Sequence, residues 1–367
     1  MIIILQISLF FTACEKKFNS QNIYHPQLAV ASDGSLLLLW RQTSGKSSDL
    51  FIAKWRMGQN FSEPVRVNQA PGVVNSNNFE EMRASIATGP DGLIAVAWTD
   101  RNWDVRAAVS KDFGRSFAPS VKLNQDTTRA MQSFVTASFD QAGGLHCVWL
   151  DPRPAKPGHE EPADLYYAFG QNGRFQERNL TAQQASSVCG CCRPYISRGN
   201  NGAIQVVFRN SMPAGFRDIF KITQISARDF SEPKQLGPAL WEITGCPSLG
   251  PIAYQDWTLW LDGSTDEMRL LAISDSASEP QVLLHATKDG SFVRTPRLVK
   301  TANDATPLVL MPGEPAGKIL LLKNSKWQVV LADVPPWCRS AAWLEDQLFL
   351  TGEVENELQF ETRAFSL

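Results

Sequence analysis

Ser110-Lys111-Asp112-Phe113-Gly114-Arg115-Ser116-Phe117 is the stretch that decides how the rest of the chain is interpreted. It follows the pattern S-x-D-x-G-x-x-F in full. An aspartate in such a turn accepts hydrogen bonds from nearby backbone N–H groups, and a glycine adopts a positive φ without steric cost. We therefore expect Ser110, Asp112, Gly114 and Phe117 to form a structural turn whose aromatic side chain packs into a sheet.

Weaker copies of this turn recur along the chain, at residues 58–64, 170–175, 227–233 and 287–296. Before each copy comes a run of small residues that ends in a polar turn, and then a strongly apolar run that ends in an aromatic residue. Those aromatic residues are Trp40, Trp98, Trp149, Phe208 and Trp260. A unit of about 50 to 60 residues built from short β-runs is typical of propeller blades. The sequence thus predicts an all-β chain with a single β-propeller.

Composition is consistent with one globular domain and argues against nucleic acid as a partner. The chain has 367 residues, of which 43% are hydrophobic and 20% charged, and its formal net charge is −2. Such a composition suits a folded domain rather than a disordered segment. A near-neutral charge gives no electrostatic attraction for nucleic acid. We expect a monomer that does not bind nucleic acid.

The complete turn at 110–117 resembles the Asp-box of the sialidase-like (BNR repeat) β-propeller superfamily, and the resemblance covers most of residues 27–367. The chain is most similar there to bacterial envelope proteins with a C-x-C-C-R stretch, here at 189–193, and a G-C-P stretch one blade later, here at 245–247. The resemblance implies six blades. Units begin near residues 28, 84, 135, 194, 249, 307 and 343. They fit six blades with a shared closing blade, and seven blades are the alternative.

The N-terminus has the features of a lipoprotein leader. Residues 1–13 are nearly all apolar but too few to span a bilayer of about 30 Å as a helix. The tetrapeptide at 11–14 resembles a lipobox that ends at Cys14, with Glu15 next. We expect lipidation of Cys14, a short tether over 15–26 and the propeller over 27–367. A lipid anchor would place the protein in the cell envelope, at the outer rather than the inner membrane. The alternative is an ordinary export signal.

Candidate ligand-binding residues follow from blade topology. The turn after each second strand and the link before each first strand open on one face of a propeller. On that face we expect Arg83, Arg101, Arg153, Arg193 and Arg209, with Trp103 and Trp241 as aromatic platforms. Guanidinium groups bind carboxylates bidentately, so several of them around one mouth predict an acidic glycan as ligand. The alternative is that these arginines form ion pairs between blades.

An enzymatic function is the second hypothesis. The resemblance implies three arginines on the sugar carboxylate, a tyrosine paired with glutamate as nucleophile, and an aspartate as acid/base. This chain has no arginine at residues 22–26, where the family carries its R-I-P signature. We therefore favour binding of an acidic glycan or an envelope protein over catalysis. A glycoside hydrolase of the exo-sialidase kind is the alternative, with Glu81, Asp100 and Asp151 as candidate carboxylates, and it loses support if these scatter around the rim.

The six cysteines that remain after Cys14 include a cluster, Cys189, Cys191 and Cys192, and Cys246 one blade later. An even number of cysteines outside the cytoplasm favours disulfides, and a bridge from the cluster to Cys246 would join neighbouring loops. Two alternatives are a thiolate site for a soft metal such as Cu(I) or Zn(II), made by these four cysteines, and a redox role for Cys191 and Cys192. No other cofactor is expected.

Overall fold

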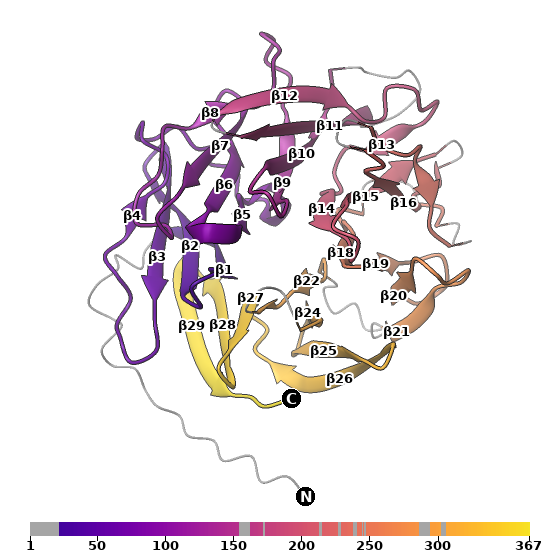
Figure 1. Cartoon of the computed structure of the whole chain (residues 1–367). Coiled ribbons are helices and arrows are strands. Elements are labelled where there is room, and N and C mark those ends of the chain that lie inside the picture. Colours follow the sequence, from indigo (N-terminus) through magenta and orange to yellow (C-terminus); the bar gives the residue numbers. More distant parts are fainter. Residues whose placement is uncertain are drawn as a thin grey trace, which may run out of the picture.

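The computed structural model describes residues 22–153, 162–171, 173–212, 215–226, 229–237, 241–243, 245, 247–285, 294–301 and 306–367. Within these ranges the chain is all-β, apart from the 3-10 helices η1 (Glu80–Met82) and η2 (Pro90–Gly92). Antiparallel sheets are arranged in a ring around a common centre (Figure 1). Cys14 and Cys246 lie outside the described residues. No helix of the described part is long and apolar enough to cross a membrane.

The first two sheets follow chain order. Sheet β1-β2-β3-β4 comprises Ile23–Val30, Leu36–Ser44, Ser47–Trp55 and Val65–Arg66. Sheet β5-β6-β7-β8 comprises Ser85–Thr88, Ile94–Thr99, Val105–Ser110 and Val121–Lys122. Strand β1 includes residues 23–26, which the sequence had placed in the tether, because Ile23 pairs with Gln42 of β2.

A nine-stranded sheet follows, and it contains two groups of four strands. The first group is β9 (Ser133–Phe139), β10 (Leu145–Asp151), β11 (Pro162–Gln171) and β12 (Arg174–Asn179). The second group is β14 (Tyr195–Arg198), β15 (Ile204–Ser211), β16 (Ile219–Thr223) and β17 (Lys234–Gln235). Strand β13 (Ser187–Cys189) joins the groups because it pairs with both β11 and β15.

Three four-stranded sheets complete the ring. One is β18 (Ile252–Tyr254), β19 (Trp257–Asp262), β20 (Arg269–Ser274) and β21 (Gln281–His285). The next is β22 (Arg297–Leu298), β24 (Leu308–Met311), β25 (Gly317–Lys323) and β26 (Lys326–Val334). The last is β23 (Lys300–Thr301), β27 (Cys338–Leu344), β28 (Gln347–Val354) and β29 (Glu357–Ala364), in which β23 is parallel to β27.

The first and last sheets of the described residues meet without exchanging strands. Figure 1 shows β1 and β2 beside β28 and β29. One hydrophobic cluster contains Leu28 and Trp40 together with Ala342 and Phe349, and the Ile23 N–H donates to the Asn356 carbonyl oxygen over 2.9 Å. Among the described strands, no sheet combines the two ends, so the expected shared closing blade is not found there. Apolar packing between the first and last sheets joins the ends instead.

The repeated aromatic residues lie where the sequence pattern places them. Trp40, Trp98, Trp149, Phe208 and Trp260 lie on β2, β6, β10, β15 and β19, and each is buried. Because these strands are covered on both faces, they consist of near-continuous apolar runs. Burial of each aromatic side chain stabilises the fold by roughly 2 to 3 kcal/mol.

The turn between β7 and β8 has the geometry expected of an aspartate-capped turn. The Asp112 carboxylate accepts the Ser116 N–H over 2.9 Å and the Ser110 hydroxyl over 2.7 Å. Gly114 has a φ of +81°. Phe117 is buried in the cluster that also contains Ile52 of the preceding sheet. The turn therefore fastens two neighbouring sheets together.

Candidate functional site

One mouth of the ring collects charged residues from distant parts of the chain, and Glu80 in η1 lies at their centre. Its carboxylate accepts a hydrogen bond from Arg294 over 2.6 Å and another from Arg297, which lies in β22. The Arg339 Nε lies 3.8 Å from the same carboxylate. Residues more than 200 positions apart thus form one network at this mouth, which we call the funnel.

The electrostatics of Glu80 reflect this surplus of cations. Burial acts to raise its pKa, but Arg297, Arg83, Arg339 and Arg294 outweigh burial and lower the pKa to about 2. Glu80 is therefore ionised throughout the physiological pH range, and its single negative charge interacts with several arginines.

Arg83 and Arg193, two predicted ligand-binding residues, lie at the funnel with Glu81. Arg83 forms an ion pair with Glu81 at 3.0 Å. Arg193 is buried and donates to the carbonyl oxygens of Glu81 over 2.8 Å and of Val135 over 2.5 Å. These bonds fix the link before β5 against β9. Arg193 is thus a positioning group for the funnel wall as well as a source of charge.

A cavity of about 100 Å³ lies along the ring centre, where the inner strands of several sheets converge. Among the described residues, its lining includes four cationic residues and no aspartate or glutamate; the cations are Arg83, Arg193, Arg297 and Lys300. The buried Nε atoms of Arg193 and Arg297 have no hydrogen-bond partner among the residues that the structure describes. Burial, then repulsion from Arg83, lowers the pKa of Arg297 to about 10. An anion in this cavity would relieve the repulsion and satisfy buried donors.

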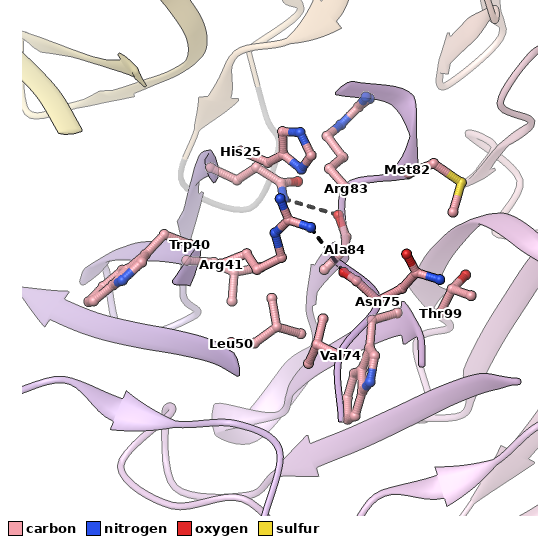
Figure 2. A pocket seen from close by; sticks show the side chains of 13 residues that line it. His25, Trp40, Arg41, Leu50, Val74, Asn75, Met82, Arg83, Ala84 and Thr99 are labelled. Carbon is pink, nitrogen blue, oxygen red and sulfur yellow. Dashed lines mark hydrogen bonds between the residues drawn. The ribbon is translucent and has the colours of Figure 1, made fainter. Parts of the chain in front are cut away.

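A second hollow beside β1 and β6 is closed by its own side chains, and Figure 2 shows Arg41 at its centre between His25 and Asn75. Arg41 donates to the carbonyl oxygens of Asn75 over 3.0 Å and Asn77 over 2.9 Å. Burial, then Arg41, lowers the pKa of His25 to about 3, so the imidazole is neutral. The remaining space of about 10 Å³ suits at most one water molecule.

Glu353, at the end of β28, is a carboxyl group of the funnel that is protonated in part at neutral pH. Burial, followed by the charge of Glu80, raises its pKa to about 7. Its Oε2 accepts the His25 N–H over 2.8 Å. Besides Glu81, the funnel thus holds Glu80, which stays ionised, and Glu353, which retains a proton in part.

The other two predicted carboxylates each close their own turn. Asp100 accepts the N–H groups of Asn102 over 2.7 Å and Asp104 over 3.1 Å. Asp151 is fully buried and accepts the Trp149 indole N–H over 3.1 Å and the Arg153 Nη2 over 2.7 Å. Within the described residues, no hydrogen bond or ion pair connects Glu81, Asp100 and Asp151 with one another.

The remaining predicted residues form local groups as well. Arg153 pairs with Glu177 over 2.5 Å and lies 4.3 Å from the centre of the Tyr166 ring. Arg209 is buried, donates to the Leu249, Arg217 and Leu261 carbonyl oxygens, and lies 4.9 Å from the centre of the Trp241 ring. Trp241 is itself buried, whereas Arg101 is exposed and Trp103 half-buried. The structure thus brings predicted residues together in separate groups, which are Glu81, Arg83 and Arg193 at the funnel, Asp151 with Arg153, and Arg209 with Trp241.

Sequence reasoning missed Arg294, Arg297, Arg339 and Glu353. Arg297 lies in the inner strand of its sheet, immediately beside the kind of link that identified Arg83 and Arg193. The sixth unit was placed near residue 307, past this strand, because β22 has two residues and no repeat signature. A search for arginines at every inner strand would have found Arg297 and Arg339.

The buried cysteine cluster lies at the end of β13 and in the turn that follows it. The Cys189 Sγ is 3.5 Å from the Sγ atoms of both Cys191 and Cys192. Cys191 is disulfide-bonded, whereas Cys189 and Cys192 are free and buried. In this state two thiols are available, fewer than the three or four protein ligands of typical zinc sites. The expected bridge to Cys246 falls outside the described residues.

Comparison with known proteins supports the fold. No protein-family model matches the chain, and no curated protein matches it. The β-propeller domain of Cps50 (Swd1) from Myceliophteria thermophila is 9% identical, with a TM-score of 0.53 over 93% of this chain and 97% of that chain. The β-propeller domain of the Trilobed protease from Pyrococcus furiosus is 9% identical, with a TM-score of 0.50 over 94% and 95%. The chain therefore has a β-propeller fold.

A Hadza microbial sialidase is also among the similar structures. It is 10% identical, with a TM-score of 0.47 over 94% of this chain. The chain spans 66% of the length of that sialidase. At such identities the likeness concerns the fold alone.

Proposed function

We propose that the protein is a seven-bladed, sialidase-like propeller of the cell envelope that binds the anionic group of an acidic glycan in its funnel without cleaving it. The observation that carries this proposal is the cavity lined by Arg83, Arg193, Arg297 and Lys300 and, among the described residues, by no carboxylate. Glu81 and Glu80 already pair with Arg83 and Arg297, but the cationic groups around the cavity outnumber these two carboxylates, so a further anion would offset the remaining repulsion. A carboxylate or sulfate group matches the bidentate geometry of guanidinium.

The blade number rests on how the strands group. Within the described residues, five sheets have four strands each and the nine-stranded sheet contributes two further groups of four, a grouping that supports seven blades. The family resemblance implies six.

The size of the cavity defines which part of a ligand it takes. About 100 Å³ accommodates a carboxylate or sulfate group with little more, whereas drug-sized ligands occupy about 300 Å³ or more. The sugar ring would therefore lie over the mouth, beside Glu80 and Arg339, with its anionic group directed towards Arg297. Recognition of this kind selects a terminal acidic residue.

Calorimetric titration of the full chain in detergent tests this proposal. N-acetylneuraminic acid and glucuronic acid serve as probes, and glucose is the neutral control. We expect the acidic sugars alone to bind, and Arg297→Gln to weaken them at least tenfold, the loss of one charge-assisted hydrogen bond. Arg115→Gln, in the exposed turn after β7, is the matched control. Equal binding of glucose, or no binding of either acid at millimolar concentration, would overturn the proposal.

A glycoside hydrolase acting on acidic sugars is the second candidate, and Glu353 is the observation that favours it. A carboxyl group that keeps its proton near pH 7 beside an ionised carboxylate is the arrangement that acid-catalysed glycoside cleavage uses. Fluorogenic sialosides and glucuronides test it. Turnover by the wild type that Glu353→Gln abolishes while sugar binding persists would establish the enzyme, and absence of turnover would leave the binder.

Lipidation of Cys14 is the remaining part of the proposal. Its support is the lipobox-like tetrapeptide 11–14. Labelling of expressing bacteria with an alkyne fatty acid, followed by membrane fractionation, tests it. We expect label and outer-membrane location in the wild type and loss of both in Cys14→Ser. Label retained by Cys14→Ser would exclude this anchor.

A further inference from the structure

The buried cluster of Cys189, Cys191 and Cys192 has no part in the proposed binding function. Cys189 belongs to β13, whose pairing with β11 and β15 fixes its backbone. The Cys192 N–H donates to the Cys189 carbonyl oxygen over 3.3 Å, which closes the turn between them. The sulfur atoms are therefore held together by the fold, and not by flexible side chains meeting by chance.

The chemical states of the three sulfurs differ. Cys191 is disulfide-bonded, and the free Cys189 Sγ lies 3.5 Å away, at van der Waals contact. The hydrogen bond with Cys192 lowers the pKa of Cys189 to about 7, while burial raises that of Cys192 well above its usual value. Arg209 also favours a thiolate at Cys189. A thiolate in contact with a disulfide sulfur is the arrangement from which exchange proceeds.

We propose that this cluster is a thiol–disulfide exchange site in which the Cys189 thiolate attacks the Cys191 sulfur. The bond between Cys189 and Cys191 forms as the bond between Cys191 and its present partner breaks. The electron pair leaves on the partner sulfur, which becomes a thiolate. One disulfide and one thiolate are present before and after, so no oxidant or reductant is consumed and the step is reversible.

Trapping of the released thiol tests the site in the intact chain. The native protein is incubated with N-ethylmaleimide at pH 8, and tryptic peptides are then analysed by mass spectrometry. The peptide 179–198 contains all three cysteines, because Arg193 precedes Pro194 and is not cleaved there. Exchange converts a cross-linked pair of peptides into peptide 179–198 with an internal disulfide, together with a second peptide that carries maleimide.

Wild type is expected to accumulate the internal disulfide, at least tenfold more slowly at pH 5 than at pH 8, because the Cys189 thiolate is scarce at pH 5. Cys189→Ser should retain only the cross-linked form, and Cys192→Ala should slow conversion by removing the hydrogen bond to Cys189. Cys338→Ser, a buried cysteine outside the cluster, is the matched control. Persistence of the cross-link in wild type, or conversion in Cys189→Ser, would overturn the proposal.

Discussion

The Arg193 guanidinium donates to the main-chain carbonyl oxygen of Arg83 across 2.6 Å, although 110 positions separate the two residues. Further bonds from Arg193 reach the carbonyl oxygens of Glu81 and Val135. One side chain before β14 thus fixes the backbone that positions Glu80 and its neighbours. Blade topology placed Arg193 among the candidate ligand-binding residues, and in the structure its side chain also holds the funnel wall.

Arg193→Ala is expected to destabilise the protein by about 3 kcal/mol or more. The substitution leaves several buried carbonyl oxygens without a donor, and each such group costs about 1 to 3 kcal/mol. Urea unfolding followed by tryptophan fluorescence measures the change. The control is Arg129→Ala, whose side chain is exposed and should alter the unfolding free energy by less than about 0.5 kcal/mol. Equal stability of the two variants would show that the Arg193 bonds contribute little.

Glu353 should make stability depend on pH between about 4.5 and 7. Burial, and then Glu80, raises its pKa in the folded protein to about 7 from 4.5. The folded state then binds more protons than the unfolded state in this pH range. The stabilising contribution of Glu353 is therefore full below pH 4.5 and is lost as the pH rises through 7. Relative to wild type, the unfolding free energy of Glu353→Gln should therefore rise by roughly 3 kcal/mol between pH 4.5 and pH 8.

Urea unfolding of both proteins at several pH values checks this difference. Glu353→Gln keeps an oxygen acceptor for the His25 N–H, so the comparison isolates the titration of the carboxyl group. Parallel stability profiles for the two proteins would mean that Glu353 does not titrate with a raised pKa. If wild type instead becomes more stable relative to Glu353→Gln as the pH rises, the ionised carboxylate is stabilised by the funnel arginines.

Local signals in the sequence identified the fold, because each acts within one turn or strand. The Asp112 turn and the buried Trp98 and Trp149 are of this kind, and short-range hydrogen bonding or apolar alternation suffices to place them. The funnel was predicted only in part. Arg297 meets Glu80 across more than 200 positions, and pairing over such distances depends on how the ring closes, which no local pattern encodes.

Packing between blades also explains why Asp151 and Arg209, two predicted site residues, contact other protein groups. Asp151 and Arg209 both lie at the ends of second strands, as expected, but neither faces open space. Arg209 is directed to carbonyl oxygens of the neighbouring blade, at Leu249 and Leu261. Position in a repeat therefore predicts which end of a blade a residue occupies, and burial between blades decides whether a ligand can reach it.

Asp151→Asn should destabilise the protein without a specific effect on sugar binding. Asp151 is fully buried and accepts hydrogen bonds from Trp149 and Arg153. Removing one partner of a buried ion pair costs about 3 kcal/mol. Urea unfolding and sugar titration measure the two properties, and Asp266→Asn, an exposed aspartate, is the control. A stable Asp151→Asn variant that lost binding or turnover would instead assign Asp151 to a ligand site.

Asp112→Ala should weaken the contact between the first two sheets by about 1 kcal/mol. The carboxylate caps the Ser116 N–H and hydroxyl, and loss of a comparable cap costs about that much. Burial acts to raise the pKa of Asp112, but hydrogen bonds from Ser116 and Ser110 outweigh it and lower the pKa. The stabilisation is therefore present above pH 4 and lost on further acidification.

Wild type and Asp112→Ala should consequently converge in stability as the pH falls below about 4. Thermal unfolding at pH 7 and at pH 3, monitored by circular dichroism, measures the convergence. Asp91→Ala, in η2 beside the same sheet, is a suitable control because Asp91 is exposed and its turn carries no such carboxylate cap among the described contacts. If the gap between wild type and Asp112→Ala is as large at pH 3 as at pH 7, the turn is held by the Ser110 hydroxyl and Gly114, and the charge of Asp112 contributes nothing to it.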